Sequence, residues 1–347
     1  MNSRKVAPVA IKGKSAVDEE YDQYIALDWS EQIMAVARTT DPRRQPQAFE
    51  RPSDIEELRQ HLLSLKGRKI LTFEETTSAQ WLYLELCDLV DRIIICDTFH
   101  NRLLVHGPKT DKIDAVKLCT LLCAGLLKEV FHSADTLYEL RRLVSGYDDV
   151  VQAGVRLLNQ HHALERAGGP THRAGQFAPF VTDYLQQSIA LYQKVKPEYE
   201  KKFAQLCRRH RLLRNLMELD GIWTIGAVKI LAVVVDARRF PTAGHYLSYC
   251  GLVKHHKLSG GRYYGQRQGR YNRLLKSVYK TAVAAALNGH NPLRAYYDYL
   301  LSKSVAEHNA RNAVARYLAK VSYGMLKSGE PYQPNRWRDE AHRAANT

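Results

Sequence analysis

Short apolar runs separated by polar turns dominate the first hundred residues of the chain. Three runs follow one another at short intervals, which predicts a meander of antiparallel strands. Asp54 then caps an amphipathic helix, and a second helix is expected from about 79 to 90, between two further apolar runs. Runs such as RIIIC have no polar face, which indicates a sheet covered by helices. The strands are expected at 23–29, 33–39, 47–51, 70–73 and 92–96.

From about residue 135 the apolar positions become spaced three and four apart, broken only at Gly154. This heptad-like seam predicts one long helix, and a second is expected from 177 to 219 with a kink at Pro197. A glycine–proline loop joins them, so we predict an antiparallel coiled-coil arm for oligomerisation or for spanning nucleic acid. Ordinary domain core explains the seam equally well. The predicted segments are a flexible basic lead-in (1–20), an α/β domain (21–132), the helical arm (133–215), a mostly α C-terminal domain (216–330) and a loose tail (331–347).

Four acidic residues stand at the ends of predicted elements. Asp28 ends the first strand and Glu74 ends the fourth, while Asp111 and Asp114 open the helix after the fifth. Residues three apart on a helix have Cβ atoms about 5–6 Å apart, so the last two carboxylates repel each other unless a cation lies between them. Ligand sites gather at strand ends in such sheets, and Mg²⁺ prefers oxygen ligands. The four acids are therefore candidate ligands of a two-metal site, although a solvated acidic first turn explains Asp111 and Asp114 without any ion.

The segment 254–273 contains six Lys or Arg residues and no acid, with glycines and tyrosines interleaved. This composition predicts a flexible loop that lies on a phosphate backbone. Ser259, followed by two glycines, is a candidate nucleophile because nearby cations stabilise an attacking alkoxide, although most such serines are plain loop residues. The histidines of the segment are proton carriers or, more simply, phosphate or solvent contacts. The predicted nucleic-acid contacts are Lys109, Lys254, His255, His256, Lys257, Arg262, Arg267, Arg270 and Arg273.

The segment Leu219–Ala227 (LDGIWTIGA) looks like a helix-hairpin-helix turn, whose backbone N–H groups can face phosphate. Trp223 stands where the second glycine of such a turn is usual. A plain turn between two helices is the alternative interpretation.

The composition supports a polyanionic partner. The 347 residues carry a formal net charge of +15, with a pI of about 9.5, which favours nucleic acid. No apolar run approaches the roughly 20 residues of a membrane-spanning helix, and the N-terminal apolar segment is too short for a signal peptide. The six cysteines form no Cys-x-x-Cys pair, so we expect no zinc site but buried free thiols in a reducing cytoplasm.

Several motifs stand in the order found in one family. ALDWS, EETTS and PKTDKIDA carry Asp28, Glu74, Asp111 and Asp114, and the C-terminal half adds LDGIWTIGA, FPTAGHYLSYCGL and the basic segment. Glu75 is the alternative to Glu74, which we prefer because Thr76 then falls at the family's threonine. From about residue 23 to 327 the chain resembles the DEDD-type insertion-sequence transposases, which include the Piv-like DNA invertases and the bridge-RNA-guided recombinases.

This resemblance implies a ribonuclease-H-like N-terminal domain, akin to Holliday-junction resolvases, whose four acids bind Mg²⁺ or Mn²⁺. It implies that Ser259 forms a covalent 5′-phosphoserine intermediate. It does not identify the arginine nearest the scissile phosphate, because the segment after residue 268 matches the family only loosely. A structured noncoding bridge RNA would pair with donor and target DNA. The two halves of the site can come from different subunits, which implies a homo-oligomer, a dimer or a tetramer on DNA.

The sequence thus predicts an RNA-guided DNA recombinase of an insertion sequence, acting in the bacterial cytoplasm at the nucleoid and not at a membrane. A metal-only structure-selective nuclease or junction resolvase would use the same four acids with water as nucleophile. A non-catalytic nucleic-acid-binding scaffold would need only the basic face.

Overall fold

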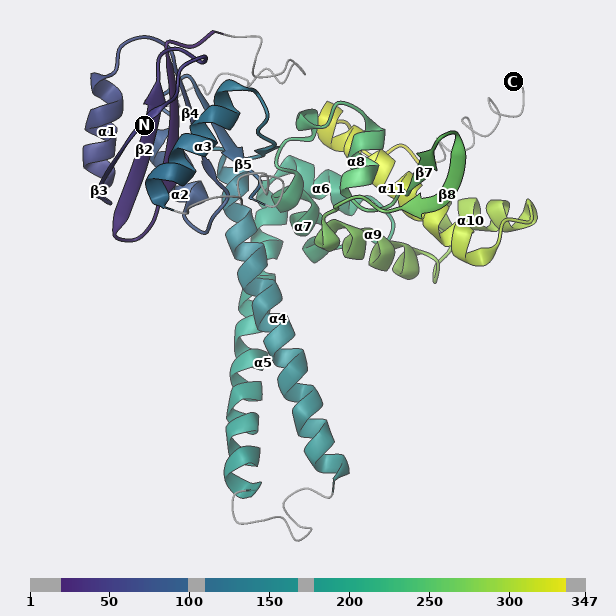
Figure 1. Ribbon diagram of the computed structural model, residues 1–347. Helices are drawn as coiled ribbons and strands as arrows, with labels where there is room; N and C mark the ends of the chain where they lie inside the picture. Colours follow the sequence, from purple (N-terminus) through teal and green to yellow (C-terminus); the bar gives the residue numbers. More distant parts are fainter. Residues whose placement is uncertain (1–19, 99–109, 168–177, 335–347) are drawn as a thin grey trace. The chain divides into compact units, whose positions relative to one another are not determined.

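The computed structural model describes residues 20–98, 110–167 and 178–334 (Figure 1). The chain divides into two compact units, Met1–Asp135 and Thr136–Thr347. The predicted lead-in, most of the predicted tail, the glycine–proline loop of the predicted arm and Lys109 lie outside the described residues.

The N-terminal unit is built on one mixed sheet with the strand order β3-β2-β1-β4-β5-β6. The first three strands form the predicted antiparallel meander, and β4 and β5 continue the sheet with parallel pairing beside β1. All five predicted strands are confirmed, whereas the two-residue β6, antiparallel to β5, is too short for its pattern to be recognised in the sequence. The strands are β1 (Gln23–Trp29), β2 (Ile33–Thr39), β3 (Gln47–Pro52), β4 (Lys69–Glu74), β5 (Arg92–Cys96) and β6 (Glu129–Val130).

Helices cover both faces of this sheet. Leucines of α1 (Ile55–Ser64) and α2 (Ala79–Leu86) pack with Ile25, Leu27 and Phe73 on one face. The other face is lined by small side chains, mainly Ala and Cys, against which α3 (Asp111–Cys123) packs. Small side chains let a helix pack closely against a sheet, and α3 accordingly packs directly on β1 and β2.

The helices of this unit begin largely where the sequence predicts. The Asp54 side chain caps α1 by accepting hydrogen bonds from two backbone N–H groups, and the Thr110 side chain caps α3 by accepting one from the Ile113 N–H. The helix expected over 79–90 is wrong in length, because α2 ends at Leu86. The chain has to turn there, since the Asp91 N–H already pairs with the Lys69 carbonyl to start β5. The ribonuclease-H-like assignment stays a prediction.

The C-terminal unit begins with two long antiparallel helices, α4 (Thr136–Arg166) and α5 (Ala178–Arg209), which we call the helical pair (Figure 1). Gly154, at which the apolar seam is interrupted, is buried and faces the Tyr192 ring. The seam therefore continues across this position through an aromatic side chain of the partner helix. Whether the helical pair is a coiled coil in the strict sense stays a prediction.

Replacing Gly154 by alanine is expected to destabilise the protein. A Cβ at this position would lie 2.3 Å from a Tyr192 ring carbon, and overpacking of this kind costs about 1–3 kcal/mol. The gain in helix propensity recovers only about 0.5–1 kcal/mol. Gly324, in helix α11 (Glu307–Ser328), has no atom within 4 Å of the corresponding Cβ, so Gly324→Ala should raise the midpoint of thermal unfolding while Gly154→Ala lowers it. Equal shifts in both variants would contradict the packing at Tyr192.

The second long helix predicted over 177–219 is two helices. The chain is extended at His210, which separates α5 from the short α6 (Arg211–Met217). The break lets Leu213 and Leu216 turn into the core of the unit, where both are buried. Pro197 lies inside α5, and the helix runs through it.

The remaining helices are α7 (Thr224–Val234), α8 (Ala243–Tyr249), α9 (Arg273–Ala286), α10 (Pro292–Ser302) and α11 (Glu307–Ser328), with a 3-10 turn η4 (Ala237–Arg239). The apolar helix α7 packs against α4, α5, α6 and α9, while α11 packs against α8, α9 and α10. Two arginines, Arg141 of α4 and Arg239, donate hydrogen bonds to the last carbonyls of α7, which satisfies groups that a helix end leaves without partners. The helical pair is thereby fixed at its base to the rest of its unit.

Two expectations from composition can be compared with the structure. Across the described residues, every helix is either too short or too polar to cross a membrane. All six cysteines are free thiols; Cys96, Cys119, Cys207 and Cys250 are buried, whereas Cys87 and Cys123 are partly exposed.

Candidate functional site

Asp28 and Glu74 occupy neighbouring positions at one edge of the sheet. Strands β1 and β4 are parallel, and their register pairs Leu27 with Phe73, one residue before each acid. Side chains alternate between the faces of a sheet, and Leu27 and Phe73 both lie in the core under α1 and α2. Asp28 and Glu74 therefore project to the opposite face, which α3 covers.

Helix α3 brings its first turn to the same edge. Near its C-terminal end, Leu122 packs with Ile70 at the start of β4. One turn earlier, the Cys119 thiol lies 3.5 Å from the Tyr24 carbonyl at the start of β1. The helix thus runs against the direction of these strands, and its N-terminal turn reaches the strand ends. Asp111 and Asp114 lie in that turn.

An ion pair fixes the level of this turn on the sheet. The Lys112 ammonium lies 3.4 Å from a carboxylate oxygen of Glu50. In the register of the sheet, Glu50 pairs with Ala35, and Ala35 pairs with Asp28. The start of α3 is therefore level with Asp28. We call Asp28, Glu74, Asp111 and Asp114 the acid group.

The acid group is an open arrangement. Among the described residues, no three of its members bring their carboxylate oxygens within 4.8 Å of one another. Like charges repel at short range, and Asp114 has Lys117 at 3.6 Å as a partial counter-charge. Asp111 is exposed and the other three are partly exposed, so the group is reachable from solvent. All donors are carboxylate oxygens, which suit hard divalent cations.

The neighbouring Glu75 is engaged elsewhere. Its carboxylate bonds to Nε2 of His132, a side chain only 3% exposed, and Nδ1 of the same ring lies 2.8 Å from the Gln80 side-chain oxygen. Successive side chains along a strand alternate between the two faces of the sheet. Glu74 projects to the face that α3 covers, so Glu75 projects to the opposite face. The geometry thus favours Glu74 over Glu75 as the member of the acid group.

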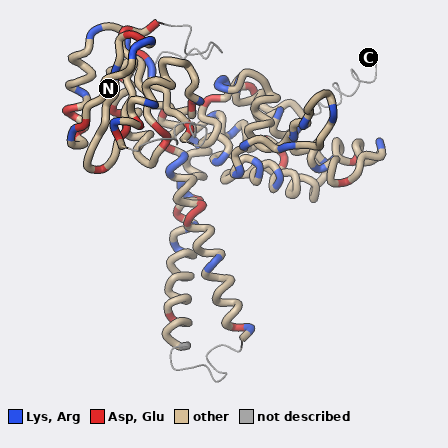
Figure 2. Tube along the Cα trace, in the orientation of Figure 1, with Lys and Arg blue, Asp and Glu red and all other residues tan. Residues whose placement is uncertain are grey.

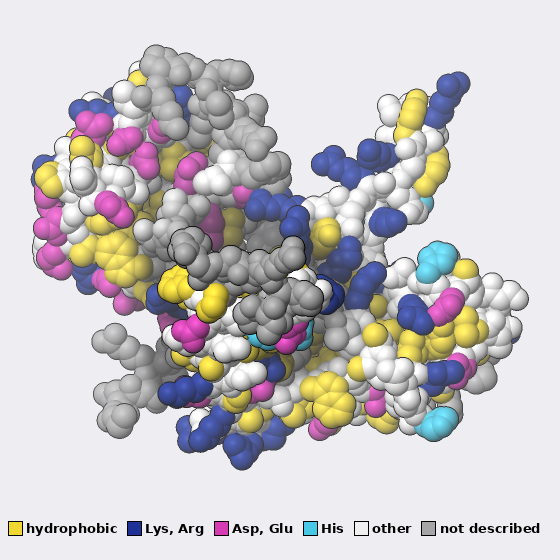
Figure 3. Space-filling model, turned by 90° about the horizontal axis from the view of Figure 1, so that it is seen from below, with side chains coloured by type: hydrophobic (Ala, Val, Ile, Leu, Met, Phe, Trp, Pro, Cys, Tyr) yellow, Lys and Arg dark blue, Asp and Glu magenta, His cyan; other side chains and the backbone are white. Residues whose placement is uncertain are grey.

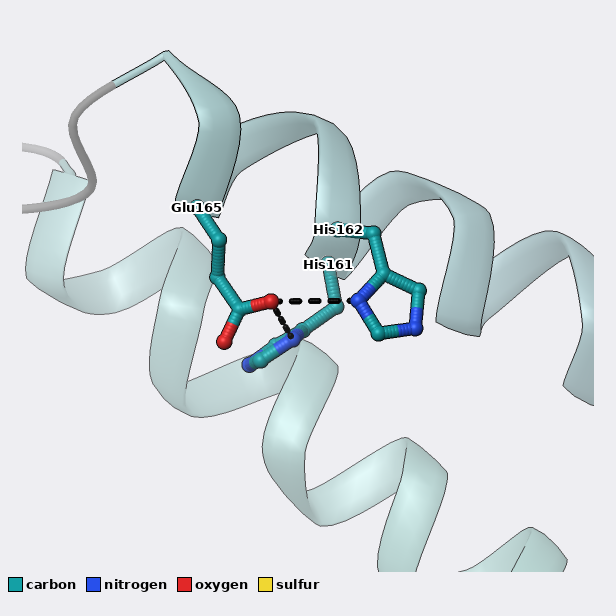
Figure 4. A group of neighbouring side chains, drawn as sticks. All are labelled: His161, His162 and Glu165. Carbon is teal, nitrogen blue, oxygen red and sulfur yellow. Dashed lines mark hydrogen bonds and ion pairs between the residues drawn. The ribbon is translucent and has the colours of Figure 1, made fainter.

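A different set of metal-ligand atoms is close together in the helical pair. His161, His162 and Glu165 of α4 are the residues in the described part of the chain whose ligand atoms all lie within 4.8 Å (Figure 4). Both histidines direct Nδ1 at the Glu165 carboxylate, at 3.6 and 3.1 Å. Such pairs at helical spacing are ordinary on exposed helix surfaces. These three residues would compete with the acid group for an added transition-metal ion.

The basic segment is a β-hairpin, so the prediction of a flexible loop is wrong. Strand β7 (His255–Ser259) pairs with β8 (Arg262–Arg267) through a two-residue Gly260-Gly261 turn. Both glycines have positive φ, 54° and 75°, as the tight hairpin turns that match strand twist require. Because glycine reaches these angles without steric cost, the residues that suggest flexibility in the sequence instead form the turn.

Ser259 lies at the tip of this hairpin, directly opposite Arg262. The register pairs these two residues across the turn, so their side chains lie on the same face. Both are exposed, and no hydrogen bond to the Ser259 hydroxyl forms within the described residues. From the sequence, Arg262 is predicted only as a nucleic-acid contact. Its pairing with Ser259 was detectable in the Gly-Gly dipeptide, which is a hairpin signal.

The other predicted contacts surround this pair. Lys and Arg follow the hairpin and continue along α9 (Figure 2), and Figure 3 shows the hairpin protruding with cationic and hydrophobic side chains in contact with solvent. His255 also bonds through Nε2 to the Ser248 hydroxyl of α8, at 3.1 Å. The contacts that the structure places, all exposed, are Lys254, His255, His256, Lys257, Arg262, Arg267, Arg270 and Arg273.

The turn before α7 faces the protein interior at its glycine. A Cβ on Gly221 would lie 2.0 Å from the Ala282 carbonyl of α9, and Gly221 has φ of 80°. Burial raises the pKa of the adjacent Asp220 carboxyl above its ordinary value. Close approach of two helices thus explains this glycine, while Trp223, 73% exposed, faces solvent at the start of α7. A connecting turn is the simpler interpretation of the segment.

Comparison with known proteins agrees with this picture of the C-terminal unit. Residues 213–298, from α6 into α10 and including the hairpin, match the model of the Transposase IS116/IS110/IS902 family. The chain is also 29% identical over 154 residues to the insertion element IS110 uncharacterized 43.6 kDa protein of Streptomyces coelicolor. That alignment covers 44% of this chain and 38% of the relative, so the chain spans well under half the length of that protein. Together these matches show that part of the chain is similar to IS110-type insertion-element transposases.

Proposed function

We propose that this chain is the site-specific DNA recombinase of an insertion sequence and that it cleaves and rejoins strands with an acid group and a serine. One observation carries the proposal. Acids from β1, β4 and α3, far apart in the sequence, project to one edge of the N-terminal sheet. They do so in a chain whose C-terminal unit matches a transposase family and presents an exposed serine among cations.

The acid group fits a divalent metal. Its donors are carboxylate oxygens that solvent reaches, the ligands Mg²⁺ and Mn²⁺ prefer. Asp28, Glu74, Asp111 and Asp114 would hold one or two such ions. When bound, a divalent ion neutralises charge on the scissile phosphate and on the departing oxygen.

Ser259 would act as the nucleophile. Its hydroxyl oxygen forms a bond to phosphorus while the bond from phosphorus to the 3′ oxygen of the DNA breaks, and the serine proton ends, in the net reaction, on that 3′ oxygen. One phosphoester replaces another, so the energy needed for rejoining is retained without a nucleotide cofactor. The 5′-phosphoserine is then resolved by attack of a 3′ hydroxyl from another strand.

Arg262 is the cation placed to assist this step. It shares a face and a cross-strand pair with Ser259, and its guanidinium can donate two hydrogen bonds to one phosphate. Arg262→Ala is expected to slow formation of the covalent intermediate by about 10²- to 10³-fold, with Arg262→Lys in between, as measured by the initial rate on labelled DNA. Arg267, opposite His255 at the far end of the hairpin, provides the matched control. If Arg267→Ala slowed the step equally, general charge and not position would be the cause.

A denaturing gel tests the reaction type. Labelled element-end DNA incubated with the protein, its RNA and Mg²⁺ should give a band of covalently attached protein. Cleaved DNA ends without that band would favour the metal-only nuclease or junction resolvase, in which water attacks. Binding with no cleavage under any divalent ion would favour the non-catalytic scaffold.

A structured guide RNA and donor and target DNA are the proposed partners, and a dimer or tetramer is the proposed assembly, since two duplexes must be exchanged. The net charge of +15 and the exposed cationic hairpin support a nucleic-acid partner of either kind. Such an enzyme would work in the bacterial cytoplasm, at the nucleoid. Sequencing the RNA that co-purifies with the protein tests the guide: one discrete RNA from the flanking locus supports it, and a broad mixture of cellular RNA opposes it.

A further inference from the structure

The hairpin has a second face with a different chemistry. Leu258 and Tyr263 form a directly opposed pair, one residue inside the Ser259–Arg262 pair. Successive side chains on a strand point to opposite faces, so Leu258 and Tyr263 lie on the face away from Ser259. The His256 ring joins them, 5.4 Å from the Tyr263 ring between centroids.

This second face is exposed to solvent in the described part of the structure. Leu258 is 67% and Tyr263 is 58% exposed, and every residue of β7 is exposed. An isolated two-stranded hairpin is only marginally stable in water. Hydrophobic side chains that lie together on an exposed surface often mark a site where a partner binds. The composition of the segment identifies the chemistry of the partner: residues 254–273 hold six Lys or Arg and no acid, so a polyanion is the surface that this hairpin can approach.

From this geometry we propose that Leu258 and Tyr263 form a wedge that contacts and unstacks DNA bases beside the phosphate that Ser259 attacks. The inference rests on the proposed function of Ser259. Leu258 is one residue from Ser259, about 3.4 Å along the strand, which is also about the rise of one base step along the axis of a DNA duplex. Because Ser259 lies at the tip of the hairpin, a phosphate bound at its hydroxyl leaves the second face free to contact the base step beside that phosphate. Apolar side chains inserted at such steps unstack and kink duplexes, and aromatic rings stack on exposed bases.

The wedge gives the two faces separate tasks. The face with Ser259 and Arg262 grips the phosphate backbone, and the face with Leu258 and Tyr263 holds the bases apart. Strand exchange requires bases to leave one partner and pair with another, so an unstacked step beside the cleaved bond is the expected starting point.

The test uses Ser259→Ala protein, which binds without reacting, and element-end duplexes with 2-aminopurine at successive positions around the junction. Binding should raise the fluorescence at one step, because an unstacked 2-aminopurine is less quenched. Adding Leu258→Ala and Tyr263→Ala should remove this rise and weaken binding roughly tenfold or more. The slope of affinity against salt should not change, since no charge is lost. Tyr263→Phe should keep the rise, because stacking does not need the hydroxyl.

Tyr264 supplies the matched control. It is 65% exposed on the same strand but lies at the irregularity opposite Lys257, outside the Leu258–Tyr263 pair. Tyr264→Ala should keep the fluorescence rise. The proposal is overturned if no position responds to binding, or if Tyr264→Ala abolishes the rise as completely as the wedge variant. Failure of the serine mechanism would show separately, as a missing covalent band in the wild-type protein while the fluorescence response persists.

Discussion

Replacing Ser259 by alanine is expected to abolish strand joining and every covalent protein–DNA adduct while nucleic-acid binding persists. The substitution removes the single oxygen that would bond to phosphorus and leaves the charge of the hairpin unchanged. The side chain is exposed, and the turn depends on Gly260 and Gly261, so the hairpin should keep its register. The loss of adduct should therefore be complete on a denaturing gel, while the dissociation constant for RNA and DNA changes less than threefold, or by well under 1 kcal/mol.

Ser277 offers a control for this experiment. It is an exposed serine on α9, close in sequence to the hairpin but on another element, and Ser277→Ala should retain the adduct. Recombination at the wild-type rate by the Ser259→Ala protein would remove this residue from the mechanism. In that event the acid group with water as nucleophile, as in a junction resolvase, becomes the better account.

The strands of the N-terminal unit were predictable because their signal is local. Four of them contain a run of apolar residues bounded by polar turns, and all five predicted segments form strands. The position of Asp28 and Glu74 at one edge of the sheet also follows from a general rule, since the ends of neighbouring parallel strands meet there. The level of α3 on the sheet was not predictable. It is set by which small residues of β1 and β2 its buried face contacts, and by the Lys112–Glu50 pair.

The basic segment shows where compositional reasoning fails. Glycine and charge together suggest mobility, yet the same glycines supply the positive φ angles of a tight turn. The consequence is chemical as well as structural. In a loop any of six cations could lie beside Ser259, whereas in the hairpin one register assigns that place to Arg262. Similarly, the break at His210 is not visible in the helical periodicity, because it serves the packing of Leu213 and Leu216 in the core.

Removing one carboxylate from the acid group is expected to stop DNA cleavage. Asp28→Asn and Asp114→Asn each replace a charged oxygen donor by a neutral amide of the same size, so the fold should be kept while the affinity for Mg²⁺ falls. Loss of a site that stabilises a developing phosphate charge costs several kcal/mol, so cleavage rates should fall at least about 10³-fold. Glu31→Gln is the matched control, because Glu31 is an exposed acid in the turn just after β1, at the same edge of the sheet. An Asp114→Asn protein that recombines normally would contradict metal binding there and favour the non-catalytic scaffold.

The same experiment separates Glu74 from Glu75. Glu74 lies on the face that α3 covers, whereas Glu75 bonds to His132 on the other side; Glu74→Gln should abolish cleavage, and Glu75→Gln should mainly lower the unfolding midpoint. Metal binding is best followed with Mn²⁺, which the partly exposed His161 and the exposed His162 and Glu165 would also bind. Titrations should therefore use a His161→Ala, His162→Ala background, in which remaining Mn²⁺ binding reports the acid group. If Asp28→Asn left that binding unchanged, the four carboxylates would not form a metal site, even though they share one edge of the sheet.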